Sequence, residues 1–385
     1  MNLRKSLRSR RTKIALVSLA AVLTMAVAAG CSTTSSSQDP GKGASATTDN
    51  ETALASLAKG NFSVPELPKL TVPKSKNVWL IPCGSAAPGC AYYVNEAKKA
   101  FQDQLGWKVT VYDGQFTPAT QSAGIQQAIT AHADAIGLVA IDCAGVKPAL
   151  QNAKKAGIPV VTLAAFDCSE SSQGGTESLF VQGDPGGSAP ALAEGQGSSL
   201  AEYIGALNPN AKILLETEPE VQLVGTAAKA FKADLPKYCP GCTVVTEMPA
   251  MLADIGNGKA AAQLSAALLQ HQDVDTIVAT QDAELTYTMN ALRTATKKYD
   301  VISTGGMESD LQLIKSGQMS GIMGNDPLLT TYEWVDTTVR SVLKEPVVQF
   351  PFASALVDSE HNTDADGNFV PLLDVKSKFH ASWGQ

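Results

Sequence analysis

The chain has 385 residues, a formal net charge of −7 at pH 7 and 17% charged residues. The first 30 positions hold six basic residues and no acidic one, so the other 355 residues carry a formal charge of −13. This acidic balance excludes a nucleic-acid partner, because phosphate backbones are bound by basic surfaces. The length favours two domains, each with its own core.

The N-terminus has the order of a secretory signal: a basic stretch, an apolar run over residues 14–29, and small residues before Cys31. A Cys directly after small residues resembles a bacterial lipobox, in which the thiol is lipidated and becomes the first mature residue. We therefore expect a signal peptide over 1–30 and an extracytoplasmic protein that lipidated Cys31 anchors to the cell membrane. Ordinary signal cleavage, with Cys31 incidental, is the alternative.

Residues 31–74 are expected to form a flexible tether. Residues 32–50 are rich in Ser, Thr and Gly, and three prolines between 65 and 73 keep the chain extended. A short helix over 51–59 is the only regular element expected there.

Six cysteines remain after Cys31, and an even number in an oxidising compartment favours disulfides. Fifteen connectivities are possible. The simplest is local pairing: Cys83–Cys90, Cys143–Cys168 and Cys239–Cys242. We predict the Cys143–Cys168 bond in particular, because both residues follow neighbouring strand ends. A metal site has little support, since only one CxxC is present.

From residue 77 onward, short apolar strands alternate with helices. Strands are expected at 78–81, 109–112, 135–141 and 158–163, with helices at 91–105, 118–131 and 146–156. The pattern recurs at 263–303, and residues 133–142 and 274–282 read as copies of one unit. Continuous apolar strands between helices predict parallel sheets covered on both faces.

The predicted fold class is α/β, with two doubly wound parallel-sheet lobes joined by a multi-strand hinge. A Gly-rich stretch at 183–187 and the Asn-Asp-Pro at 325–327 are the expected crossings. Lobe one is expected at 75–183 and about 326–350. Lobe two and a C-terminal return are expected at 184–325 and about 351–385.

These stretches resemble the type I periplasmic binding proteins of the ribose/galactose class over about residues 76–345. The matching pieces are Leu105-Gly106-Trp107, Asp113-Gly114-Gln115, Ala133-Asp134-Ala135-Ile136, Ala156-Gly157-Ile158-Pro159-Val160-Val161, Gly183-Asp184 and Asn325-Asp326-Pro327. The resemblance implies two lobes that close on a small solute and deliver it to the permease subunits of an ABC importer.

The family's sugar-binding positions are only partly kept. The aromatic pair that sandwiches a sugar ring is missing or supplied by Tyr92 or Tyr93, and Ala164-Ala165 stand where the family often has Asp-Arg. Gly305 replaces an expected Asp, while Gln281 and Asn325 keep a polar residue. A transport role therefore gains support, and a pentose or hexose ligand loses it.

Candidate ligand contacts follow strand ends or lie at crossings, near helix N-termini. They are Ser85, Tyr92, Asp142, Phe166, Asp167, Gln222, Gln281, Asp282, Asn325 and Asp326. For Asp142 and Asp282 the competing interpretation is helix capping.

We expect a monomeric, lipid-anchored binding protein that captures a small polar, sugar-like solute for an ABC importer, with no cofactor and no metal. No catalytic motif is present. The alternatives are a receptor that reports to a membrane sensor kinase and, with less support, an extracytoplasmic enzyme.

Overall fold

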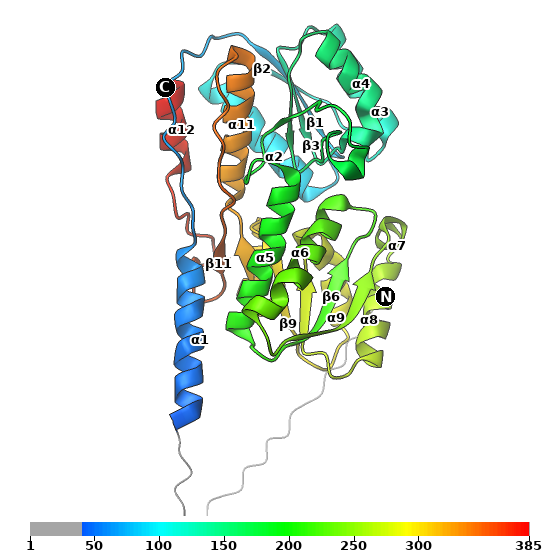
Figure 1. Cartoon of the computed structure of the whole chain (residues 1–385), viewed down its shortest axis with the longest axis vertical. Coiled ribbons are helices and arrows are strands. Elements are labelled where there is room, and N and C mark those ends of the chain that lie inside the picture. Colours follow the sequence, from blue (N-terminus) through cyan, green and yellow to red (C-terminus); the bar gives the residue numbers. More distant parts are fainter. Residues whose placement is uncertain (1–40, 385) are drawn as a thin grey trace, which may run out of the picture. The chain divides into compact units, whose positions relative to one another are not determined.

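The computed structural model describes residues 41–384, so the expected signal peptide and Cys31 lie outside the described residues (Figure 1). Its strands form two separate sheets, one of five strands and one of six. None of the described helices combines the length and the apolar composition that a bilayer span requires.

Lobe one is built on a parallel sheet of order β2-β1-β3-β4-β5. Its strands are β1 (Asn77–Pro82), β2 (Lys108–Val111), β3 (Ala135–Val139), β4 (Val160–Leu163) and β5 (Val181–Gln182). Its helices are α2 (Pro88–Lys99), continued by a π-helical turn over Ala100–Gln104, then α3 (Pro118–Thr130) and α4 (Cys143–Lys155).

Lobe two repeats this topology. Its strands are β6 (Lys212–Thr217), β7 (Thr243–Pro249), β8 (Thr276–Ala279), β9 (Asp300–Gly305), β10 (Gly321–Gly324) and β11 (Ala355–Val357). Its helices are α5 (Ala189–Leu207), α6 (Gln222–Tyr238), α7 (Leu252–Gly256), α8 (Lys259–Gln270), α9 (Leu285–Leu292) and α10 (Glu308–Lys315). The order β7-β6-β8-β9-β10 is that of lobe one, and β11 adds an antiparallel edge.

The strands form where the sequence is continuously apolar. Every residue of β3, β4, β8 and β10 is buried, as expected for parallel strands covered on both faces. Thr117 and Ser188 cap α3 and α5 through their side chains, each with a proline in the first turn. The predicted α/β fold of two doubly wound lobes is confirmed.

After the crossing at 325–326, the chain returns to lobe one as α11 (Pro327–Leu343). Trp334 on this helix is fully buried, and its indole nitrogen donates to the carbonyl oxygen of Val161 at 3.2 Å. Gly137 and Gly183 make room for the ring, since a β-carbon at either would lie 2.7 Å from an indole carbon. The return is therefore locked into the sheet of lobe one.

The expected tether through residue 74 is wrong for its second half. In α1 (Gly41–Lys59), Leu54, Leu57 and Ala58 pack on the core of lobe two. Apolar residues between 62 and 72 then pack on the core of lobe one. Their spacing between the prolines supplies an apolar face that a solvated tether would lack.

The C-terminal segment also departs from the expectation, which grouped 351–385 with lobe two. β11 does join the sheet of lobe two, but α12 (Val375–Trp383) packs with α11 in the core of lobe one (Figure 1). Phe379 and Trp383 stack around Tyr332, with ring centroids 5.6 Å from it. The aromatic residues of α12 therefore determine its place.

One buried ion pair connects the N-terminal segment, α11 and α12. The Arg340 guanidinium donates to Asp336 at 2.6 Å, and Trp383 donates to the other oxygen of the same carboxylate at 2.8 Å. Arg340 also reaches the carbonyl oxygen of Pro68, which accepts a further bond from Ser382 at 2.9 Å. Asp336 and Arg340 are 0% and 1% exposed.

We predict that Asp336→Ala lowers the free energy of unfolding by about 3–5 kcal/mol, because it leaves the Arg340 charge buried without a partner. Chemical denaturation measures this. The double variant Asp336→Leu/Arg340→Met should lose much less, because it removes both charges. A single variant as stable as the wild type would show that the pair is not buried in solution.

Candidate solute-binding cleft

The common strand order places a switch point in each sheet. Sequence order reverses between β1 and β3 in lobe one and between β6 and β8 in lobe two. Ligands of open parallel sheets bind outside the carboxyl ends of the strands at such points, near helix N-termini. The loops after these four strands therefore define the candidate cleft.

In lobe one, Ser85, Tyr92 and Asp142 lie beside this switch point. Ser85 is exposed, and its amide donates to Asp113 at 2.8 Å. Tyr92 packs edge-to-face on Tyr93, with ring centroids 5.6 Å apart. Asp142 precedes α4 without capping it, and instead accepts from the amide of Phe166 at 2.9 Å. Its second oxygen has no hydrogen bond among those of the described residues.

Phe166 and Asp167 are buried, at 3% exposure each. One oxygen of Asp167 accepts from the amides of Cys168, Leu179 and Phe180, and the other accepts from a serine hydroxyl. This set of donors lowers the pKa of Asp167 against the opposing effect of burial. The structure therefore gives Asp167 a role in shaping its own loop.

The predicted Cys143–Cys168 disulfide forms, with Cα atoms 5.2 Å apart, and it joins the start of α4 to the loop after β4. Cys83–Cys90 and Cys239–Cys242 pair as well, which is the local pairing considered from the sequence. The first two bonds lie at the carboxyl edge of lobe one and fix its loops.

In lobe two, Gln281 and Asp282 follow β8 and behave differently. Gln281 forms a capping box with Glu284, to which its backbone amide donates. The side-chain amide of Gln281 donates to the side-chain oxygen of Gln196 at 2.7 Å. Asp282 lies against Gly305: a β-carbon there would be 3.2 Å from a carboxylate oxygen of Asp282 and 2.7 Å from one of Asp310. Burial, with the charge of Asp310, raises the pKa of Asp282 to about 7.

Asn325 and Asp326 occupy the second crossing. The amide of Asn325 donates to the carbonyl oxygen of Gly305 at 2.9 Å, while its side-chain oxygen is buried without a hydrogen-bond partner. Asp326 caps α11 by accepting from the amides of Leu328 and Leu329. Both residues lie at the carboxyl edge of lobe two.

Groups from both lobes lie close together at these edges. Burial raises the pKa of the Tyr93 hydroxyl, and the charges of Asp282, Asp326 and Asp184 raise it further, so all three carboxylates lie near it. At another point, the Gln173 amide donates to the side-chain oxygen of Gln222 at the start of α6. Gln173 also accepts from the amide of Ala144 in α4, so it links one helix N-terminus of each lobe.

Sequence reasoning missed several residues of this site. Gln173, Asp310 and Glu333 lie on three helical segments with no motif, and only the fold brings them near Gln222, Asp282 and Asp326 respectively. Two other residues could have been found from the sequence, because Asp184 lies in the Gly-rich crossing at 183–187 and Tyr93 is adjacent to Tyr92. Asp184 accepts from the amide of Ala164 after β4.

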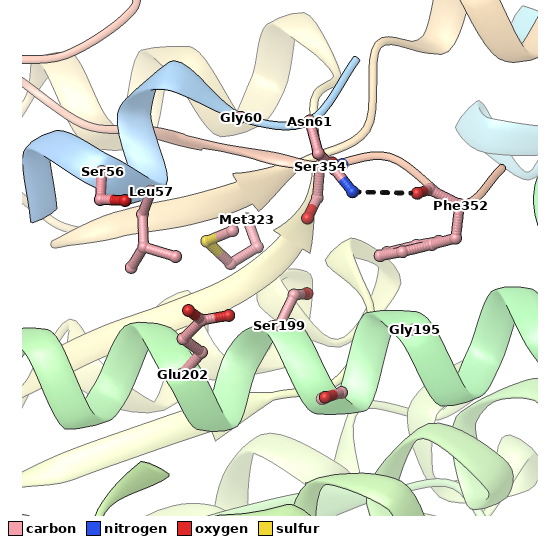
Figure 2. A pocket seen from close by; sticks show the side chains of 11 residues that line it. Ser56, Leu57, Gly60, Asn61, Gly195, Ser199, Glu202, Met323, Phe352 and Ser354 are labelled. Carbon is pink, nitrogen blue, oxygen red and sulfur yellow. Dashed lines mark hydrogen bonds between the residues drawn. The ribbon is translucent and has the colours of Figure 1, made fainter. Parts of the chain in front are cut away.

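A cavity of about 320 Å³ lies outside this site, between α1, α5, β10 and the segment 352–354 (Figure 2). Asn61 closes one side of it, because its side-chain amide donates to the carbonyl oxygen of Phe352 at 3.2 Å. The Phe352 ring covers Gly195, where a β-carbon would lie 2.5 Å from it. No predicted ligand residue lines this cavity.

Comparison with known proteins identifies the family. A family model described as a periplasmic binding protein domain matches residues 78–345, so the chain belongs to that family. No curated protein sequence matches the chain. The family match leaves α1 and residues 60–76 before it and β11 and α12 after it.

Solved structures share the fold. A Burkholderia graminis ABC transporter solute-binding protein in complex with D-arabinose aligns with TM-score 0.62 and 22% identity, over 76% of this chain and 98% of that one. A Mycobacterium smegmatis ABC transporter solute-binding protein with bound glycerol gives 0.60 and 21%, over 74% and 95%. Another Mycobacterium smegmatis protein, in complex with β-D-fucofuranose, gives 0.60 and 17%, over 80% and 98%.

We predict that Gln222→Ala raises the dissociation constant of a bound solute about 2- to 10-fold, chiefly through faster release. The reason is the loss of one neutral hydrogen bond between closed lobes. Stopped-flow release measures it, with exposed Gln270→Ala on α8 as control. Adding Gln173→Ala should change release little further, and release from Gln222→Ala at the wild-type rate would contradict the contact.

Proposed function

We propose that this protein captures a small polar solute between its lobes and presents it to the permease of an ABC importer. The main support is that two sheets of the same strand order place polar residues at their carboxyl edges. Among them, Asp282 and Asp326 lie near Tyr93. Solute-binding proteins of this fold have been solved with D-arabinose, glycerol and D-allose. These bound ligands support a polyhydroxylated ligand for this chain.

The cleft is proposed to bind rather than to convert its ligand. Its carboxylates come from both lobes, and several of them also hold loops or cap helices, as Asp184 and Asp326 do. Residues fixed in this way suit recognition. Recovery of the solute unchanged after denaturation of the protein distinguishes binding from turnover.

Asp282 provides the sharpest test of the ligand site. D-arabinose, D-allose and glycerol are screened by thermal shift, and binding of the best ligand is measured by calorimetry. We expect one solute per chain. Asp282→Ala should weaken binding about 5- to 150-fold, the effect of losing a hydrogen bond to a buried group at about 1–3 kcal/mol.

The matched control is Asp273→Ala, at an exposed position before the other end of β8. It should bind like the wild type. Equal affinity of the Asp282 and Asp273 variants would contradict a site at the carboxyl edge of lobe two. Binding of none of these or any co-purified solute would contradict the function.

We also propose that lipidated Cys31 anchors the protein outside the cytoplasm. The order of basic, apolar and small residues before Cys31 supports this, as does membership of a periplasmic binding protein family. Cys31→Ser should move the protein from the membrane fraction to the medium or leave an uncleaved precursor, measured by fractionation and intact mass. A processed, membrane-bound Cys31→Ser protein would contradict the anchor.

A further inference from the structure

Four carboxylates from different elements gather where the lobes join. Asp184 lies in the first crossing, Asp326 in the second, Glu333 on α11 and Asp282 after β8; we call these four the acidic floor. The charges of Asp282, Asp326 and Asp184 act on the Tyr93 hydroxyl, and those of Asp326 and Asp184 act on Glu333. Three of these carboxylates therefore lie near Tyr93, and Glu333 lies near two of those three.

The acidic floor has no basic partner in residues 50–384. The ion pairs of these residues all involve other acids, and the buried guanidinium of Arg340 is held by Asp336. Burial raises the pKa of Asp184 to about 7 and that of Glu333 well above its usual value. Both shifts reflect charge buried without a counter-charge.

Two carboxylates of the acidic floor also have an oxygen without a hydrogen-bond partner. One oxygen of Asp184 and one of Glu333 are buried without a partner, in side chains that are 4% and 2% exposed. The side-chain oxygen of Asn325, next to Asp326, is a third such acceptor. The Asn325 oxygen is an acceptor, and each carboxylate becomes one when it is ionised. A buried acceptor is stabilised by a donor, most of all a charged one.

Building on the proposed function, we propose that the solute carries a protonated amine which binds at the acidic floor beside Tyr93. An ammonium group brings three N–H donors and the missing positive charge, whereas a neutral hydroxyl brings a single donor and no charge. The Tyr93 ring adds a face suited to a cation. The ligand class is an amino sugar or amino polyol.

Matched pairs of solutes that exchange a hydroxyl for an amine test this at pH 7. The pairs are D-glucose and D-glucosamine, D-galactose and D-galactosamine, and glycerol and 2-amino-1,3-propanediol. In at least one pair we expect the amine to bind 10-fold or more tightly than its partner, by calorimetry. Asp282→Asn should abolish most of that preference, and the exposed Asp273→Asn should keep it.

Glu333→Gln separates a ligand role from a structural one. Burial raises the pKa of Glu333 and favours its protonated form, which the amide resembles in shape and charge. The ligand-free protein should therefore melt at the same temperature, while the amine preference falls because the amide cannot ionise. A lower melting temperature with an unchanged preference would assign Glu333 to the scaffold and overturn its place in the site.

The remaining outcomes are also decisive. If the neutral member of a pair binds as tightly as its amine or more tightly, the amine proposal fails while the solute-binding function stands. If no pair binds, the solute released from protein purified from its host is identified by mass spectrometry. A cationic solute supports the proposal, a neutral or anionic one overturns it, and no solute at all contradicts the proposed function as well.

Discussion

The site depends on one geometric constraint: in a parallel sheet, every strand ends at the same edge. Each lobe therefore collects the loops after its strands, with their free amides and polar side chains, along a single line. The chain repeats the same strand order twice and crosses between the repeats, which brings the edges together around Tyr93, Asp184 and Asp326. Buried polar groups gather there because the loops and helix N-termini at the carboxyl ends of the strands carry polar groups that the sheet itself does not bond.

The segments outside the family match add a second constraint. The N-terminal segment passes from the core of lobe two to that of lobe one, and the C-terminal segment does the same from β11 to α12. Both end on α11, where Asp336 and Arg340 tie them together. Asn61 bonds to residues 352 and 354, so the two segments also touch at the hinge. These two segments therefore connect the lobes in addition to the crossings at 183–187 and 325–326.

Much of the fold could be predicted from the sequence, because buried parallel strands such as 135–139 are continuous apolar runs. The doubled unit identified the two lobes, and local cysteine spacing pointed to the disulfides that form. The tether and the C-terminal return were misjudged. Their apolar residues are sparse and lie between prolines, and they become a packing face only when α11 provides its other side.

The sequence indicated where the candidate residues lie better than it indicated what each side chain does. Strand ends are visible in the sequence, so Asp142, Asp282 and Asn325 lie at the carboxyl edges where they were expected, and their contact with a ligand stays a prediction. Whether a polar residue caps a helix, shapes a loop or faces a ligand depends on distant donors. Asp167 accepts hydrogen bonds from the backbone amides of Leu179 and Phe180, more than ten positions along the chain. Gln281 donates to Gln196 on α5. Such contacts leave no local pattern.

The most direct measurement of the central claim is the distance between the lobes with and without solute. Spin labels at exposed Ser172 and Lys229, one on each lobe, report it by pulsed resonance, since the native cysteines at 83–242 are paired. A bound solute should narrow a broad or longer distance distribution to a single shorter one, and Asp282→Ala should restore the broad distribution. An identical distribution with and without a tightly bound solute would contradict a cleft that closes between the two sheets.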